Sequence, residues 1–108
     1  MTFSIKSGVR LIGMRPEMSY ANTAVVGVFT DMGFDCVMTA GVDGKHSRAS
    51  AHYTGRAADY RTRHVPEDQH VLLGNKLREA LGPEFDVLIE TTPPHVHVEY
   101  DPKEPVTA

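Results

Sequence analysis

Apolar residues recur every three or four positions in two stretches of the chain, which is the spacing of one buried helix face. In the first stretch the pattern is carried by Ala21, Val25, Val28 and Met32. Pro16 suits the first turn of a helix and Gly33 is a natural stop, so we expect a helix over about 17–32. The second stretch is carried by Leu73, Leu77, Ala80 and Leu81. Acidic residues at its start and a Gly-Pro pair at its end predict a helix over 66–81.

Shorter segments have the composition or the alternation of apolar and polar residues that is typical of strands. We expect strands over 9–13, 34–39, 57–62, 85–90 and 95–100. Two consecutive prolines do not pair inside a sheet, so 91–94 is a turn and the last two strands form an antiparallel hairpin. The predicted fold is α+β, with two helices packed on one face of a small, mostly antiparallel sheet.

Length and composition narrow the class of protein. The chain of 108 residues fits one domain over 1–108, with a fraying tail at 102–108. A formal net charge of −3 is no footprint for nucleic acid or an anionic membrane, and no apolar run is long enough to predict a membrane span. No secretory signal is visible, so we expect a cytoplasmic protein as synthesised. The lone Cys36 excludes an internal disulfide and predicts a small buried hydrophobic side chain.

Histidines gather in the last predicted strand, HVHVEY (95–100). Side chains alternate along a strand, so His95, His97 and Glu99 share one face while valines occupy the other. This arrangement suits a polar pocket beside a core. It equally suits a solvated outer face, on which His and Glu are common.

A second histidine lies in SAHYTGRAAD (50–59), where Gly55 separates His52 from Asp59. A glycine lets the chain bend, so both side chains are able to converge with His97. Two nitrogens and one carboxylate oxygen suit zinc, and three protein ligands with an open fourth position are typical of a catalytic site. The alternative is that Asp59 pairs only with a neighbouring arginine.

The two segments together resemble a known family. SxHxxGxAxD followed downstream by HxH is the signature of zinc peptidases of the D-alanyl-D-alanine carboxypeptidase superfamily, which includes peptidoglycan-cleaving phage endolysins and the vancomycin-resistance dipeptidases. DGKHSRASAHYTGRAAD (43–59) and ETTPPHVH (90–97) are most similar to the Hedgehog N-terminal signalling domain and its bacterial and phage relatives. The resemblance covers about 39–100 and implies the fold of that superfamily.

The resemblance also implies a role for each matching residue. His52, Asp59 and His97 match the three zinc ligands, and Glu90 matches the acidic residue that serves as general base. His95 matches the other His of the HxH pair and His46 a His just before the first ligand, both expected to assist catalysis. Two departures are visible in the sequence. Glu90 lies seven positions before His97 where the Hedgehog pattern has six, and TAGVDG (39–44) has Asp43 alone where animal Hedgehog domains carry a calcium site.

The residue pattern predicts a zinc site in a monomeric protein, and the resemblance implies a zinc metallopeptidase, a carboxypeptidase or endopeptidase that cuts a peptide bond in bacterial peptidoglycan. Such an enzyme would act on the cell wall after release or export. The main alternative is a catalytically silent, Hedgehog-like module in which zinc stiffens the fold and the surface binds a protein. A metal-dependent amidase acting on other substrates is a third possibility. Three arginines are candidates for binding a substrate carboxylate, or are simply solvated surface charges: Arg48, Arg56 and Arg61. His64 and His70 are expected to be surface or capping residues.

Overall fold

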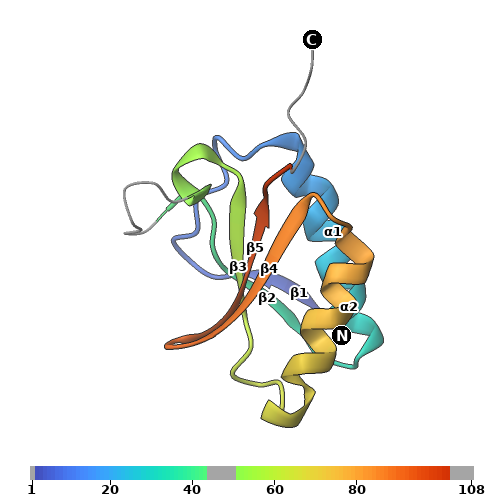
Figure 1. The fold of residues 1–108 in the computed structure, drawn as a ribbon. Coiled ribbons are helices and arrows are strands. Elements are labelled where there is room, and N and C mark those ends of the chain that lie inside the picture. Colours follow the sequence, from blue (N-terminus) through green and yellow to red (C-terminus); the bar gives the residue numbers. More distant parts are fainter. Residues whose placement is uncertain (1, 44–50, 103–108) are drawn as a thin grey trace.

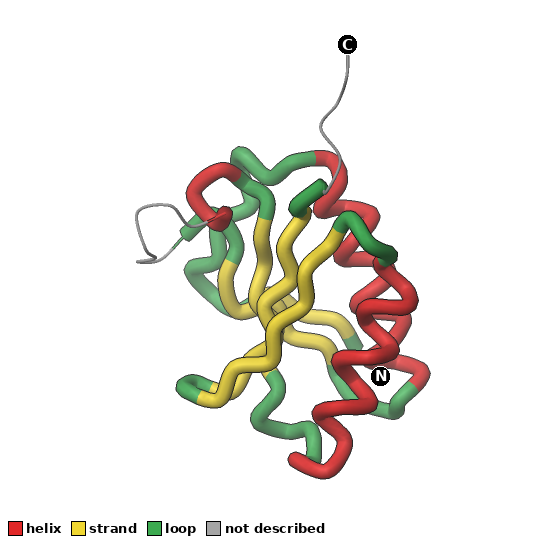
Figure 2. The backbone as a smooth tube through the Cα atoms, in the orientation of Figure 1, coloured by secondary structure: helices red, strands yellow, loops and turns green. Residues whose placement is uncertain are grey.

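The computed structural model describes residues 2–43 and 51–102. Two α-helices cover one face of a five-stranded sheet with strand order β1-β2-β3-β5-β4, and among the described residues no α-helix lies on the opposite face (Figures 1 and 2). The strands are β1 (Phe3–Ile5), β2 (Cys36–Ala40), β3 (Ala57–Arg61), β4 (Phe85–Thr91) and β5 (Pro94–Tyr100). β1 runs parallel to β2, and the other neighbouring pairs are antiparallel. The predicted α+β fold class is confirmed.

Both helices form where the apolar spacing predicts them. α1 (Pro16–Asp31) has proline in its first turn, and Gly33, at a φ of 84°, follows its end. α2 (His70–Leu81) is preceded by a short 3-10 helix, η2 (Glu67–Gln69). The first turn of the helix predicted over 66–81 is therefore 3-10 rather than α-helical. The two helices lie side by side on the sheet (Figure 1).

The core lies between the helices and the sheet. Its largest fully buried apolar side chains are Tyr60, Phe29, Leu73, Leu77, Val25, Val96 and Val98. Cys36 belongs to the same core at 1% exposure, and burial raises the pKa of its thiol to about 12. The prediction of a small buried hydrophobic side chain at this position is therefore confirmed.

The predicted strand over 9–13 is wrong. The first strand is Phe3–Ile5, and the segment after it is a loop bounded by Gly8 and Gly13, both at positive φ. A strand cannot continue through such residues, and Ile12, at 85% exposure, has no core to enter. The carboxylate of Asp43 holds the loop in place, because it accepts hydrogen bonds from the backbone N–H groups of Arg10 and Gly41.

The register of the strands determines which side chains lie together on the face of the sheet opposite α1 and α2. Directly opposed residues of antiparallel strands project to the same side, so β3, β5 and β4 present three rows of side chains there. The rows are Ala57-Glu99-Asp86, Asp59-His97-Leu88 and Arg61-His95-Glu90. We call these positions the open face. Both histidines of the HxH pair lie in its central strand.

Within the described residues, no helix combines the length and the apolar character needed to cross a bilayer.

Candidate metal centre

Three side chains from three different elements converge at the open face. His52 comes from a short 3-10 helix, η1 (Ala51–Thr54), Asp59 from β3 and His97 from β5. The Nε2 of His52 lies 3.2 Å from the Nδ1 of His97 and 3.2 Å from the Oδ1 of Asp59, and that oxygen lies 2.9 Å from the Nδ1 of His97. We call these three residues the cluster. Tertiary folding thus brings together residues separated by up to 45 positions in the sequence.

His52 is held from behind by the backbone. Its Nδ1 donates a hydrogen bond of 2.7 Å to the carbonyl oxygen of Gly41, and the side chain is 2% exposed. Gly41 follows β2 and packs closely against the loop before α1. A Cβ at this position would lie only 2.6 Å from the carbonyl oxygen of Arg10. Because a carbonyl only accepts, the Nδ1 of His52 carries a proton, and Nε2 is the nitrogen directed at Asp59 and His97.

Gly55 makes the bend between His52 and Asp59 possible. Its φ is +73°, a conformation that side chains disfavour, and a Cβ at this position would collide with the carbonyl oxygen of Gly13. The carbonyl of Gly55 also accepts a hydrogen bond from the N–H of Arg15. The predicted bend is present, and the close approach of the N-terminal loop requires glycine there as well.

Glu99 orients His97 from the other side of the ring. Its Oε1 lies 3.0 Å from the Nε2 of His97, and a carboxylate oxygen accepts, so this nitrogen carries a proton. The hydrogen bond turns the Nδ1 edge of the ring toward Asp59 and His52. Carboxylates that accept from the outer nitrogen of a ligand histidine are a common feature of metal sites.

The cluster perturbs its own ionisation. The carboxylate of Asp59 raises the pKa of His97 to about 9, against an opposing effect of burial and with a further contribution from Glu99. Burial acts to raise the pKa of Asp59, but hydrogen bonds from His52 and His97 hold it well below its usual range. At neutral pH the Nδ1 of His97 therefore carries a proton, which it donates to the Oδ1 of Asp59.

This donor set fits a divalent cation. Two imidazole nitrogens and one carboxylate oxygen face one point, and all three atoms lie within 4.8 Å of one another. Tetrahedral ligands of zinc lie roughly 3.3 Å apart, close to the separations in the cluster. A cation at this point would take the place of the proton on the Nδ1 of His97, and the outer hydrogen bonds to Gly41 and Glu99 already leave the inner nitrogens directed at it.

Glu90 and His95 form a pair next to the cluster. The Nε2 of His95 lies 3.5 Å from the Oε1 of Glu90 and 4.0 Å from the Oδ2 of Asp59. Its Nδ1 donates to the carbonyl oxygen of Pro93 at 2.6 Å, so a second proton on the ring would lie at Nε2, between two carboxylates. The Glu90 side chain is 44% exposed. His46, the remaining predicted catalytic residue, lies outside the described residues.

The arginines differ in how they are used. Arg56 donates to the carbonyl of Tyr100 and to the hydroxyl of Thr54, which makes it a structural tie. Arg61 lies on the open face opposite His95. Arg48 lies outside the described residues. The ion pairs of Asp59 are made with histidines rather than with the neighbouring arginines suggested as an alternative.

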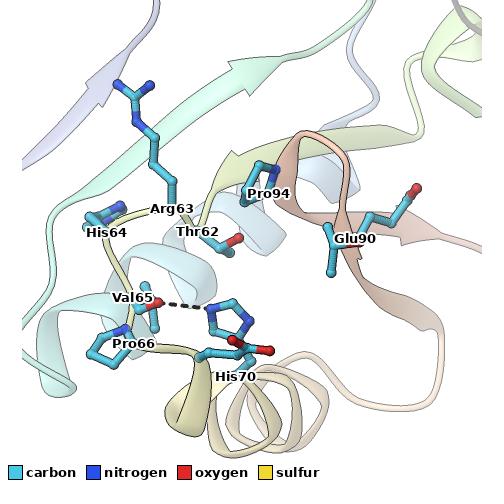
Figure 3. Close-up of a pocket in the computed structure, with 10 residues that line it drawn as sticks. Thr62, Arg63, His64, Val65, Pro66, His70, Glu90 and Pro94 are labelled. Atoms are coloured by element: carbon cyan, nitrogen blue, oxygen red, sulfur yellow. Dashed lines mark hydrogen bonds between the residues drawn. The ribbon is translucent and has the colours of Figure 1, made fainter.

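A pocket of about 550 Å³ lies at one end of the sheet, between the segment that leads from β3 to α2 and the β4–β5 hairpin (Figure 3). Glu90 and Pro94 line it, together with the buried Thr62, whose hydroxyl has no hydrogen-bond partner within residues 2–43 and 51–102. His70 donates to the carbonyl of Val65 here. None of the cluster residues lines this pocket, and Thr62 lies on the helix side of the sheet. The pocket adjoins the cluster's surroundings at Glu90, which pairs with His95.

His64 lies outside the cluster as well. Its Nε2 donates to the carbonyl of Asp35 at 2.7 Å, and its ring contacts Phe29 and Phe34. His64 and His70 therefore both tie one segment of backbone to another, as the prediction of a capping role for them requires.

No family model matches this chain, and no curated protein matches it either.

Proposed function

We propose that this protein is a zinc-dependent metallopeptidase that hydrolyses a peptide bond in bacterial peptidoglycan. The observation that carries the proposal is the convergence of the His52 Nε2, Asp59 Oδ1 and His97 Nδ1, with the outer nitrogen of each histidine donating to an oxygen. Three protein ligands leave a coordination position open, as catalytic zinc sites require. The substrate class rests on the resemblance of the two motifs to wall peptidases.

His52, Asp59 and His97 would hold the metal. When bound, zinc polarises the scissile carbonyl and acidifies water, which supplies a nucleophile at neutral pH. Glu90 accepts the proton of the attacking water and returns it to the leaving amine as the C–N bond breaks. The Nε2 of His95 donates a hydrogen bond to the oxygen that becomes negative, and a donor of this kind contributes about 100-fold or more to the rate.

A second function has one observation in its favour. The Glu90 carboxylate is 44% exposed and meets His95, rather than being enclosed beside the cluster. A protein-binding module that uses zinc only to stiffen its fold has no need to enclose this group. In that case the open face is the binding surface.

A digest with mass-spectrometric readout separates the two functions. Zinc-loaded protein is incubated with purified peptidoglycan of several chemotypes, beside Glu90→Ala and the control Glu79→Ala, an exposed position on α2. We expect new peptide ends from the wild type and the control, and none from Glu90→Ala at full zinc content. No cleavage by zinc-loaded wild type on any chemotype would instead favour the binding module.

A further inference from the structure

A second pocket, of about 390 Å³, lies on the helix side of the sheet, at the end away from the β4–β5 turn. It forms where the start of α1, the end of α2 and the paired ends of β4 and β5 meet. Three aromatic residues and two glutamates line it: Tyr20, Phe85, Tyr100, Glu17 and Glu84. None of the cluster residues belongs to this lining, and neither Glu90 nor His95 does.

The aromatic rings are packed against one another. The ring centroid of Phe85 lies 6.1 Å from that of Tyr20 and 5.3 Å from that of Tyr100. Tyr20 is 58% exposed, yet its hydroxyl donates to the carbonyl oxygen of Ala80 in the last turn of α2. The hydrogen bond ties the exposed ring in place, so the free protein already has the aromatic lining arranged.

The charges around the rings favour a positive ligand. Glu17 and Glu84 line the pocket, and no lysine, arginine or histidine is among its described lining residues. The Oε1 of Glu17 is buried and makes no hydrogen bond within the described part of the chain. It lies 3.4 Å from the Nε of Arg15, in a partly exposed pair of the kind that contributes little. α2 ends in this pocket at Leu81, and the C-terminal end of a helix carries partial negative charge.

This combination of rings and carboxylates selects one class of ligand. The face of an aromatic ring attracts a cation that lies within about 6 Å of its centre. A bare metal ion is a poor fit, because within the described residues Glu17 and Glu84 belong to no group of three ligands that could hold one. A sugar requires donors as well as acceptors, whereas ionised carboxylates only accept and the Tyr20 hydroxyl already donates to Ala80.

We propose that this pocket binds an organic ammonium group, which packs against the aromatic rings and directs its charge at Glu17 and Glu84. The volume is sufficient for a trimethylammonium group together with part of the chain that carries it. Quaternary amines and the primary amine of a lysine side chain share this chemistry. The inference does not depend on the metal centre or on the proposed peptidase activity.

Matched probes test the charge of the ligand. The protein is titrated with choline, with neohexanol, which is the uncharged isostere of choline with carbon in place of nitrogen, and with N-acetyl-lysine methylamide. NMR signals of the Tyr20, Phe85 and Tyr100 rings report the binding. We expect the better of the two cations to bind about fivefold or more tightly than neohexanol, and that cation identifies the source. Equal affinity for neohexanol, or shifts confined to the open face, would overturn the proposal.

Variants test the lining. Glu17→Gln, Glu84→Gln and Tyr20→Leu should each weaken binding of the preferred cation by about threefold or more. Glu79→Gln removes the same charge from an exposed position on α2 outside the pocket and should bind as the wild type does. Glu84 is exposed, so its substitution tests the charge even if Tyr20→Leu fails to fold.

Arg15→Gln provides a test of opposite sign. It removes the cation that is paired with Glu17, so it should strengthen binding of the ammonium probe. Full affinity in both Glu17→Gln and Glu84→Gln would overturn the proposal, and so would a loss of affinity in Glu79→Gln equal to theirs. Each of these results leaves the peptidase proposal unaffected, because zinc binding and cleavage are measured separately.

Discussion

The Oε1 of Glu99 accepts a hydrogen bond of 3.0 Å from the Nε2 of His97. This nitrogen is on the ring edge opposite the Nδ1 that faces Asp59. The two residues are neighbours on one face of β5, so the alternation of side chains along this strand places the carboxylate beside the histidine that it orients. From the sequence alone, Glu99 is the alternative to Glu90 as the acidic catalytic residue, because it shares the strand face of His97. Its contact with the outer ring nitrogen makes it a positioning residue for His97.

Replacing Glu99 should weaken zinc binding while leaving the fold intact. Without the carboxylate the His97 ring loses its fixed orientation, and loss of such outer partners commonly costs about 10–100-fold in metal affinity. Competition with a chromophoric chelator measures the affinity of Glu99→Gln. Asp86→Asn, in the same row of the open face, is the control and should bind as the wild type does. Equal affinity in both variants would show that Glu99 does not orient the ligand.

His52→Ala and Asp59→Ala should each lose bound zinc. Zinc should then raise the melting temperature of the wild type but of neither variant, because a ligand stabilises only the state that binds it. Metal analysis after dialysis and a thermal melt with and without zinc check both points. His64→Ala removes a histidine whose ring nitrogen contacts only a backbone carbonyl, that of Asp35, and should keep its zinc. Unchanged metal content in both cluster variants would refute the ligand set.

Gly55→Ala should destabilise the protein by about 1–3 kcal/mol or more, because the residue needs positive φ and a Cβ would meet the carbonyl of Gly13. Gly27→Ala is the contrasting substitution. Gly27 lies within α1 with open space around its Cβ position, so alanine there should stabilise by about 0.5–1 kcal/mol. Urea unfolding of both variants measures the difference. Similar effects of the two would mean that the N-terminal loop does not crowd Gly55.

Cys36 should make the fold less stable in alkaline solution. Its folded pKa of about 12 lies above the ordinary value of 9.0, so between these pH values the folded state keeps a proton that the unfolded state releases. Stability is then complete below pH 9 and falls as the pH rises, by about 1 kcal/mol at pH 10. Urea unfolding at pH 8 and pH 10 measures this loss. Cys36→Ala should remove that share of the pH dependence, and an identical dependence in the variant would contradict the assignment.

The spacing of apolar residues along the chain was sufficient to predict much of the fold. The helical spacing of Val25 and Leu77 and the alternation in HVHVEY reflect local geometry, which each segment carries in its own residues. Hence the helices, the hairpin and the shared face of His95, His97 and Glu99 follow from sequence. The position of the first strand did not follow from the sequence. The apolar run before Gly13 has the composition of a strand, but it lies between two glycines at positive φ and meets no core.

The candidate site depended on contacts between distant segments. The residue types at 52, 59 and 97 are those of a metal site, and sequence by itself determined that much. Only the tertiary structure decided that a carbonyl at Gly41 and a carboxylate at Glu99 hold the outer nitrogens of the two histidines. It also decided that Arg56 is tied to the backbone whereas Arg61 faces His95. Hydrogen bonds across 11 and 44 positions depend on how the strands register, and no local pattern encodes that register.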